Sequence, residues 1–103
     1  MKNSLMANNL TEALVLANKD FNLDISSTEV STGEDFQLIL AKLIRHLLDN
    51  DFERLINGLY RIDVSEEKVK QALSASGDIA EEITTLIIKR EMQKVETRRK
   101  HKN

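Results

Sequence analysis

The sequence predicts an all-α protein, an irregular or orthogonal bundle of four to five helices with a long C-terminal helix. The chain has 103 residues, no proline and only three glycines. Turns between strands favour glycine and proline, so their scarcity argues against a β fold. Apolar residues recur at helical spacing. Only four residues are aromatic, three phenylalanines and one tyrosine. We therefore expect one helical domain over residues 1–103 with an aliphatic core.

The first expected helix covers about residues 4–19. Its apolar face consists of Leu10, Ala13, Leu14 and Ala17. The segment that follows is rich in Ser, Thr and Asp, which is typical of a loop. Alternating apolar residues in its first part indicate a short extended piece on the core, and these residues are Phe21, Leu23 and Ile25.

The second expected helix begins after Thr32, which can cap it together with Asp35 in a capping box. It carries the broadest apolar surface of the chain and is expected to be the central helix. The third helix begins near Asp51. It contains Gly58, which suggests that another stretch of backbone passes close to it.

The stretch "LYRIDVSEEKVKQAL", residues 59–73, is interpreted as a corner between two helices. Ser65 is a preferred N-cap, and Glu66 and Glu67 suit the positive end of a helix dipole. Asp63 is the alternative cap. A DNA-binding helix-turn-helix over residues 51–73 is disfavoured, because two acidic residues would lie where DNA contacts are normally made.

The last expected helix begins after Asp78, with Glu81 at the capping-box position, and extends toward the C-terminus. Its first half has one apolar face, and its second half has another on roughly the opposite side, formed by Ile88, Met92 and Val95. A single core covers one such face. Either the N-terminal segment or a second copy of the protein is expected to cover the other, and we expect a homodimer interface at these three residues.

Charge is distributed unevenly along the chain. Residues 1–88 contain 8 basic and 15 acidic residues, whereas residues 89–103 contain 7 basic and 2 acidic residues. The basic C-terminal part is a candidate contact for nucleic acid or another polyanion, but it also suits solubility and the negative end of a helix dipole. The candidate polyanion contacts are Lys89, Arg90, Lys94, Arg98, Arg99 and Lys100.

Residues suited to catalysis or metal binding are sparse. The chain has no cysteine, which excludes disulfides, thiolate nucleophiles and Cys-ligated zinc. His46 has Asp49 nearby, but metal sites usually need three or four ligands. We expect no catalytic residue, no metal and no cofactor. The N-terminus has no apolar run typical of a signal peptide, and no stretch is long enough to span a bilayer, so a cytoplasmic location is expected.

Two strings, "LIRHLLDNDFERLINGLYRIDVSEEKVKQAL" (43–73) and "LIIKREMQKVETRRK" (86–100), resemble a group of small bacterial all-helical proteins of unassigned function. The most distinctive parts are "LYRIDVSE" and "QKVETR". The resemblance implies a bacterial setting, and it transfers no activity and no site residue.

The sequence therefore predicts a non-enzymatic protein-interaction module that associates with itself through the C-terminal helix. The first alternative is a nucleic-acid- or ribosome-associated protein that uses the basic residues. The second alternative is a small-ligand binder or enzyme with a pocket lined by Tyr60, Arg61 and His46.

Overall fold

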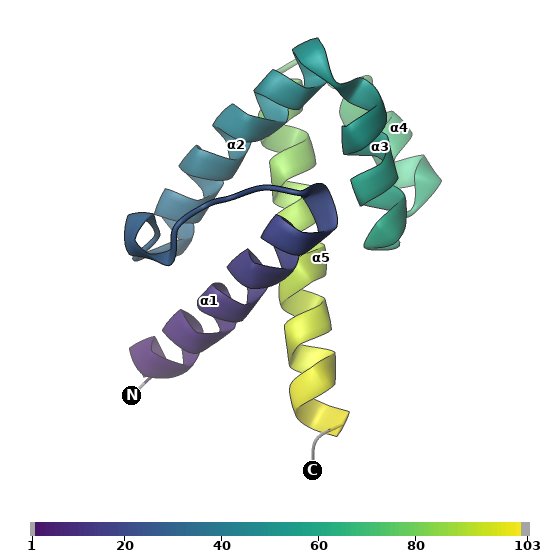
Figure 1. The fold of residues 1–103 in the computed structure, drawn as a ribbon. Coiled ribbons are helices and arrows are strands. Elements are labelled where there is room, and N and C mark those ends of the chain that lie inside the picture. Colours follow the sequence, from purple (N-terminus) through teal and green to yellow (C-terminus); the bar gives the residue numbers. More distant parts are fainter. Residues whose placement is uncertain (1, 102–103) are drawn as a thin grey trace.

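Five α-helices make up most of residues 2–101 in the computed structural model, which describes the side chains of residues 9–100 (Figure 1). The helices are α1 (Lys2–Phe21), α2 (Gly33–Asn50), α3 (Phe52–Arg61), α4 (Glu66–Leu73) and α5 (Ile79–His101), with a 3-10 turn η1 at Ser27–Glu29. The predicted all-α fold with a long C-terminal helix is confirmed. Helix α5, and not α2 as expected, is the central element, because α1, α2 and α4 all pack against it.

The helix starts follow the capping residues expected from the sequence. Thr32 Oγ1 accepts a hydrogen bond from the Asp35 amide at 3.1 Å, and the Asp35 carboxylate accepts one from the Thr32 amide at 3.2 Å. Asp51, Ser65 and Asp78 each accept a hydrogen bond from the amide three residues on, at 3.2–3.3 Å. These bonds satisfy amides that the helices themselves leave without partners.

The "LYRIDVSE" stretch is a corner, as expected. Helix α3 ends in a Schellman motif, in which the Val64 amide bonds to the Leu59 carbonyl at 3.2 Å. Asp63 occupies the left-handed region with a φ of 62°. Ser65 then caps α4. Asp63 thus ends one helix and does not begin the next.

The extended piece expected at Phe21, Leu23 and Ile25 is not formed as such, because Phe21 ends α1 and the Leu23 amide bonds back to the Asn18 carbonyl at 2.8 Å. The Asn18 side chain forms two hydrogen bonds with the backbone of Ile25, at 2.9 and 3.0 Å. Ile25 is buried, and Ser27–Glu29 form the turn η1 within a segment that was expected to be a loop. The first helix is also longer than the expected 4–19, because it continues to Phe21.

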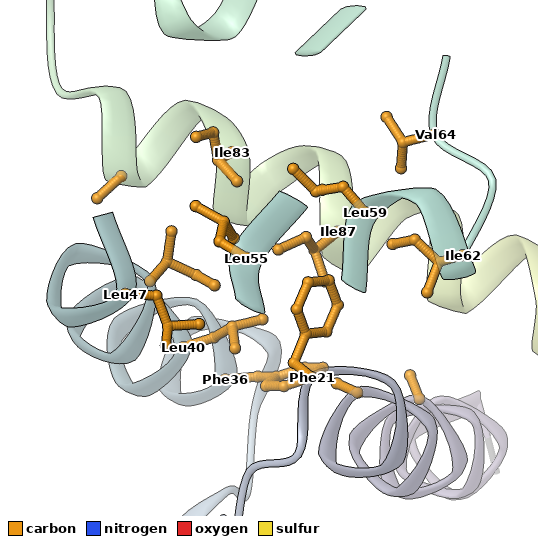
Figure 2. Close-up of a cluster of buried hydrophobic side chains, with 14 of the residues drawn as sticks. Phe21, Phe36, Leu40, Leu47, Leu55, Leu59, Ile62, Val64, Ile83 and Ile87 are labelled. Carbon is orange, nitrogen blue, oxygen red and sulfur yellow. The ribbon is translucent and has the colours of Figure 1, made fainter. Parts of the chain in front are cut away.

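The core is aliphatic and has two phenylalanines, Phe21 and Phe36, within it. Figure 2 shows side chains from α1, α2, α3 and α5 converging on one cluster. Gly58 lies in this cluster, where a Cβ atom would overlap the ring atoms Cδ1 and Cε1 of Phe21. The close approach predicted at Gly58 therefore exists, but a phenylalanine ring makes it and not a backbone.

The second apolar face of α5 is covered within the same chain. Helix α1 runs antiparallel to this half of α5, since Asp20 lies beside Lys94 and Glu12 beside Arg99. Val95 is fully buried, and Ile88 and Met92 are partly buried against the same core.

Burial of Val95 within the chain removes it from the surface, so it does not offer the exposed apolar contact expected of it, whereas Ile88 and Met92 remain partly exposed. Small residues on α1, Ala13 and Ala17, are fully buried, which suits a close approach of the two helices. Self-association through the C-terminal helix stays a prediction.

A helix that crosses a bilayer needs about 20 predominantly apolar residues. None of the described helices is both long enough and apolar enough to cross a membrane.

Candidate functional site

A cluster of three titratable residues lies between α1 and α5. Asp20 is in the last turn of α1 and is 7% exposed, and Glu91 on α5 is fully buried. The Lys94 ammonium lies 3.8 Å from Asp20 Oδ2 and 4.0 Å from Glu91 Oε1. We call Asp20, Glu91 and Lys94 the acid–lysine cluster. Burying carboxylates is unfavourable unless they are paired or neutralised, so the cluster needs a physical explanation.

The Glu91 carboxyl group holds a proton at neutral pH. Burial is the largest cause of a rise in its pKa from 4.5 to about 8, the neighbouring Asp20 carboxyl group adds to this rise, and the positive charges of Lys94 and Arg90 oppose it. Neither Glu91 oxygen, nor Asp20 Oδ2, receives a hydrogen bond from a protein donor. A proton on Glu91 would give this pair of carboxyl groups a donor of its own.

Sequence reasoning missed this cluster, although one signal was present. Glu91 lies four residues from Ile87 and four from Val95, so it shares their buried face of α5. An acidic residue at an apolar position of a helix indicates a buried partner. Nothing in the sequence identified Asp20 as that partner, because it lies on a helix at the other end of the chain.

Arginines from α3 hold the end of α1 in place. Arg54 donates to the carbonyl of Phe21 at 3.0 Å and to that of Asn22 at 2.9 Å, and Arg61 donates to the carbonyl of Asp20 at 3.3 Å. Basic groups at a helix C-terminus stabilise the negative end of its dipole. These bonds position Asp20 against α5.

Half of the predicted polyanion contacts hold groups of the chain itself. Arg90 Nε donates to the carbonyl of Ile62 at 2.8 Å, and Arg99 forms an ion pair with Glu12 at 2.8 Å. Lys94 belongs to the acid–lysine cluster. The other three predicted contacts are exposed, namely Lys89, Arg98 and Lys100.

Three basic residues converge on one hollow of the surface. Arg90, Lys94 and Arg98 follow one another at four-residue spacing along one face of α5, and they line a hollow of about 260 Å³ together with Thr97 and Leu16. We call it the basic hollow. Leu16 comes from α1 and gives the hollow an apolar wall. A concave site lined by cations concentrates positive potential, so the basic hollow suits a group that is both acidic and apolar.

The positive surface continues on the other side of Arg90. Lys68 and Lys89 line a neighbouring hollow of about 320 Å³, to which Arg90 also contributes. This hollow also contains Asp63 and lies between the α3–α4 corner and α5. Arg90 therefore connects two hollows along α5.

None of the hollows described here is lined by Tyr60 or His46, the residues expected to form a pocket with Arg61. Tyr60 is 58% exposed, and His46 is exposed on α2, where its ring and carbonyl contact the Asn50 amide. Arg61 lines a different hollow, next to Asp20 and Arg54. Among the residues described by the structure, no group of three His, Asp or Glu residues could hold a metal ion.

Comparison with known proteins provides no relative. No family model matches the chain, no curated protein matches it, and no solved structure matches it. The resemblance at "LYRIDVSE" therefore stays a prediction. A functional argument for this chain must come from its own geometry.

Proposed function

We propose that this protein is a non-enzymatic interaction module that binds an acidic segment of another protein in the basic hollow. The observation that carries the proposal is the convergence of Arg90, Lys94 and Arg98 on a concave surface that has Leu16 as an apolar wall. The cations would pair with carboxylates of the segment, and the wall would contact an apolar side chain next to them.

A protein segment suits this surface better than nucleic acid does. Nucleic-acid affinity depends on many phosphate contacts along an extended surface, whereas the hollow offers three cations, Arg90, Lys94 and Arg98. Residues 1–88 are acidic overall and would repel a long polyanion. A short acidic segment with an apolar anchor needs only the few cations that the hollow offers.

The test measures peptide binding by fluorescence anisotropy. The probe is a labelled 12-residue peptide of alternating Glu and Leu, blocked at both ends, and the comparison peptide has Gln in place of Glu. We expect the acidic peptide to bind and the Gln peptide to bind far more weakly. A 12-nucleotide single-stranded DNA is the third probe, and tighter binding of this DNA than of the acidic peptide would favour the nucleic-acid alternative.

A matched pair of variants locates the site. Arg98→Glu reverses an exposed charge in the hollow, and we expect it to weaken peptide binding roughly tenfold through loss of a charge-assisted contact. Lys42→Glu makes the same charge change on the exposed face of α2 and should change affinity less than about twofold. Equal effects of the two variants would show that only net charge matters and would reject the basic hollow as the site.

A further inference from the structure

Lys94 belongs to two environments at once. Its ammonium lies within 4.0 Å of the buried carboxyl groups of Asp20 and Glu91, and its side chain also lines the basic hollow. Resting on the proposed function, we propose that Glu91 regulates the basic hollow through Lys94, so that the hollow binds its acidic segment when Glu91 is protonated and binds it weakly when Glu91 is ionised.

The charged groups around Glu91 leave Lys94 as the residue that can respond. Asp20 faces Glu91 from α1, and Arg61 of α3 is held at the Asp20 carbonyl. On α5, Arg90 donates to the Ile62 carbonyl at 2.8 Å and to Gln93 Oε1 at 3.4 Å. The Lys94 ammonium has no bond of that kind, since its contacts are the two carboxyl groups themselves at 3.8 and 4.0 Å.

The direction of the effect follows from the charge of the pair. When Glu91 is protonated, Lys94 faces one negative charge, that of Asp20. When Glu91 is ionised, Lys94 faces two negative charges, and these draw its ammonium inward and cancel its attraction for an incoming carboxylate. Because burial raises the pKa of Glu91 to about 8, this change occurs just above neutral pH.

Linkage requires the reverse effect as well. A carboxylate bound beside Lys94 competes with Glu91 for the ammonium and therefore favours the protonated form of Glu91. Binding near pH 8 should thus be accompanied by uptake of a proton. This uptake can be measured on the unaltered protein.

The experiment compares the wild type with Glu91→Gln, which imitates the protonated side chain. The end-blocked Glu/Leu peptide is titrated at pH 6.5 and pH 9.0 at constant ionic strength. We expect wild-type affinity to fall about fivefold or more between these pH values, in the range of typical coupling between sites. Glu91→Gln should retain its pH 6.5 affinity at pH 9.0. Glu96→Gln, an exposed change on the same helix, should behave as the wild type does.

Calorimetry at pH 8 in two buffers of different ionisation enthalpy gives a second readout. Wild type should take up a proton on binding, and Glu91→Gln should not. Binding without proton uptake, or the same pH dependence in both proteins, would overturn the role of Glu91 and leave the proposed function standing. Absence of peptide binding at both pH values would overturn the proposed function and this inference with it. The wild-type calorimetry decides the matter even if Glu91→Gln does not fold.

Discussion

The two halves of α5 are buried by different chemistry. In the first half, Ile83 and Ile87 are fully buried among aliphatic side chains, and the buried Thr84 hydroxyl donates to the Ala80 carbonyl at 2.7 Å. In the second half, Glu91 is as completely buried as Val95, and Lys94 reaches two carboxyl groups. The first half packs mainly with α2, and the second half packs with α1 (Figure 1).

The first half of α5 therefore only stabilises the fold, whereas the second half can also respond to a change in pH. Aliphatic contacts contribute a free energy that does not depend on pH, because they contain no titratable group. The contact between α1 and α5 contains an acid whose proton uptake depends on pH, and it borders a basic hollow. The halves should therefore respond differently to mutation, pH and salt, and four predictions test that contrast.

The largest effect is expected from Ile87→Ala in the first half. Ile87 is fully buried in the core, so removing its side chain should lower the free energy of unfolding by about 2–5 kcal/mol. Urea denaturation measures the loss, and it should be the same at pH 5 and pH 8. Val15→Ala, at a site 60% exposed, is the control and should change stability by less than about 0.5 kcal/mol. A loss that varies with pH would contradict the contrast.

The next largest change in stability is expected at the contact between Phe21 of α1 and Gly58 of α3. Gly58→Ala places a Cβ atom against the buried ring of Phe21, and the overpacking should lower the free energy of unfolding by about 1–3 kcal/mol. Gly33→Ala is the matched control, because no atom lies within 4 Å of its added Cβ and it begins α2. Thermal denaturation compares the two. Equal melting temperatures would show that Phe21 moves aside without penalty.

The acid–lysine cluster is expected to make the free energy of unfolding depend on pH, with a smaller change per pH unit than the two core substitutions cause. Between pH 4.5 and about 8, folded Glu91 keeps a proton that the unfolded chain has lost. Stability is therefore greatest at the acidic end of this window and falls as the pH rises, by on the order of 1 kcal/mol per pH unit from this group. Above pH 8 the contribution levels off, because both states are then ionised.

Denaturation of wild type and Glu91→Gln across this window isolates the contribution of Glu91. The difference between the two free energies of unfolding should change with the slope given above. Glu96→Gln, on the exposed side of α5, should show no such difference from wild type. Parallel curves for wild type and Glu91→Gln would mean that Glu91 titrates normally.

The smallest effect is expected at the far end of the α1–α5 contact. The ion pair between Glu12 and Arg99 joins side chains that are 46% and 37% exposed. A double-mutant cycle with Glu12→Gln and Arg99→Gln should give a coupling of about 0.2–1 kcal/mol, and 1 M salt should weaken it. A coupling above 2 kcal/mol would show that this end of the contact resembles the buried cluster.

Features that depend on neighbours within a few residues were predictable from the sequence. The capping box of Thr32 and Asp35, the caps at Asp51, Ser65 and Asp78, and the corner at residues 59–73 all involve bonds between groups at most five positions apart. Helical periodicity and the lack of proline likewise determined the all-α class and the aliphatic core. These are local interactions, and the sequence presents both partners together.

Tertiary structure decided what depends on segments far apart in the chain. The periodicity of α5 revealed a second apolar face at Ile88, Met92 and Val95, but both α1 and a second copy satisfied the pattern equally well. Only the packing shows that Val95 lies on the same buried face as Ile87 and Glu91, that the Phe21 ring lies against Gly58, and that Asp20 lies beside Glu91 and Lys94. Period and spacing specify which residues face inward along one helix, whereas the partner of each depends on how the helices are arranged in space.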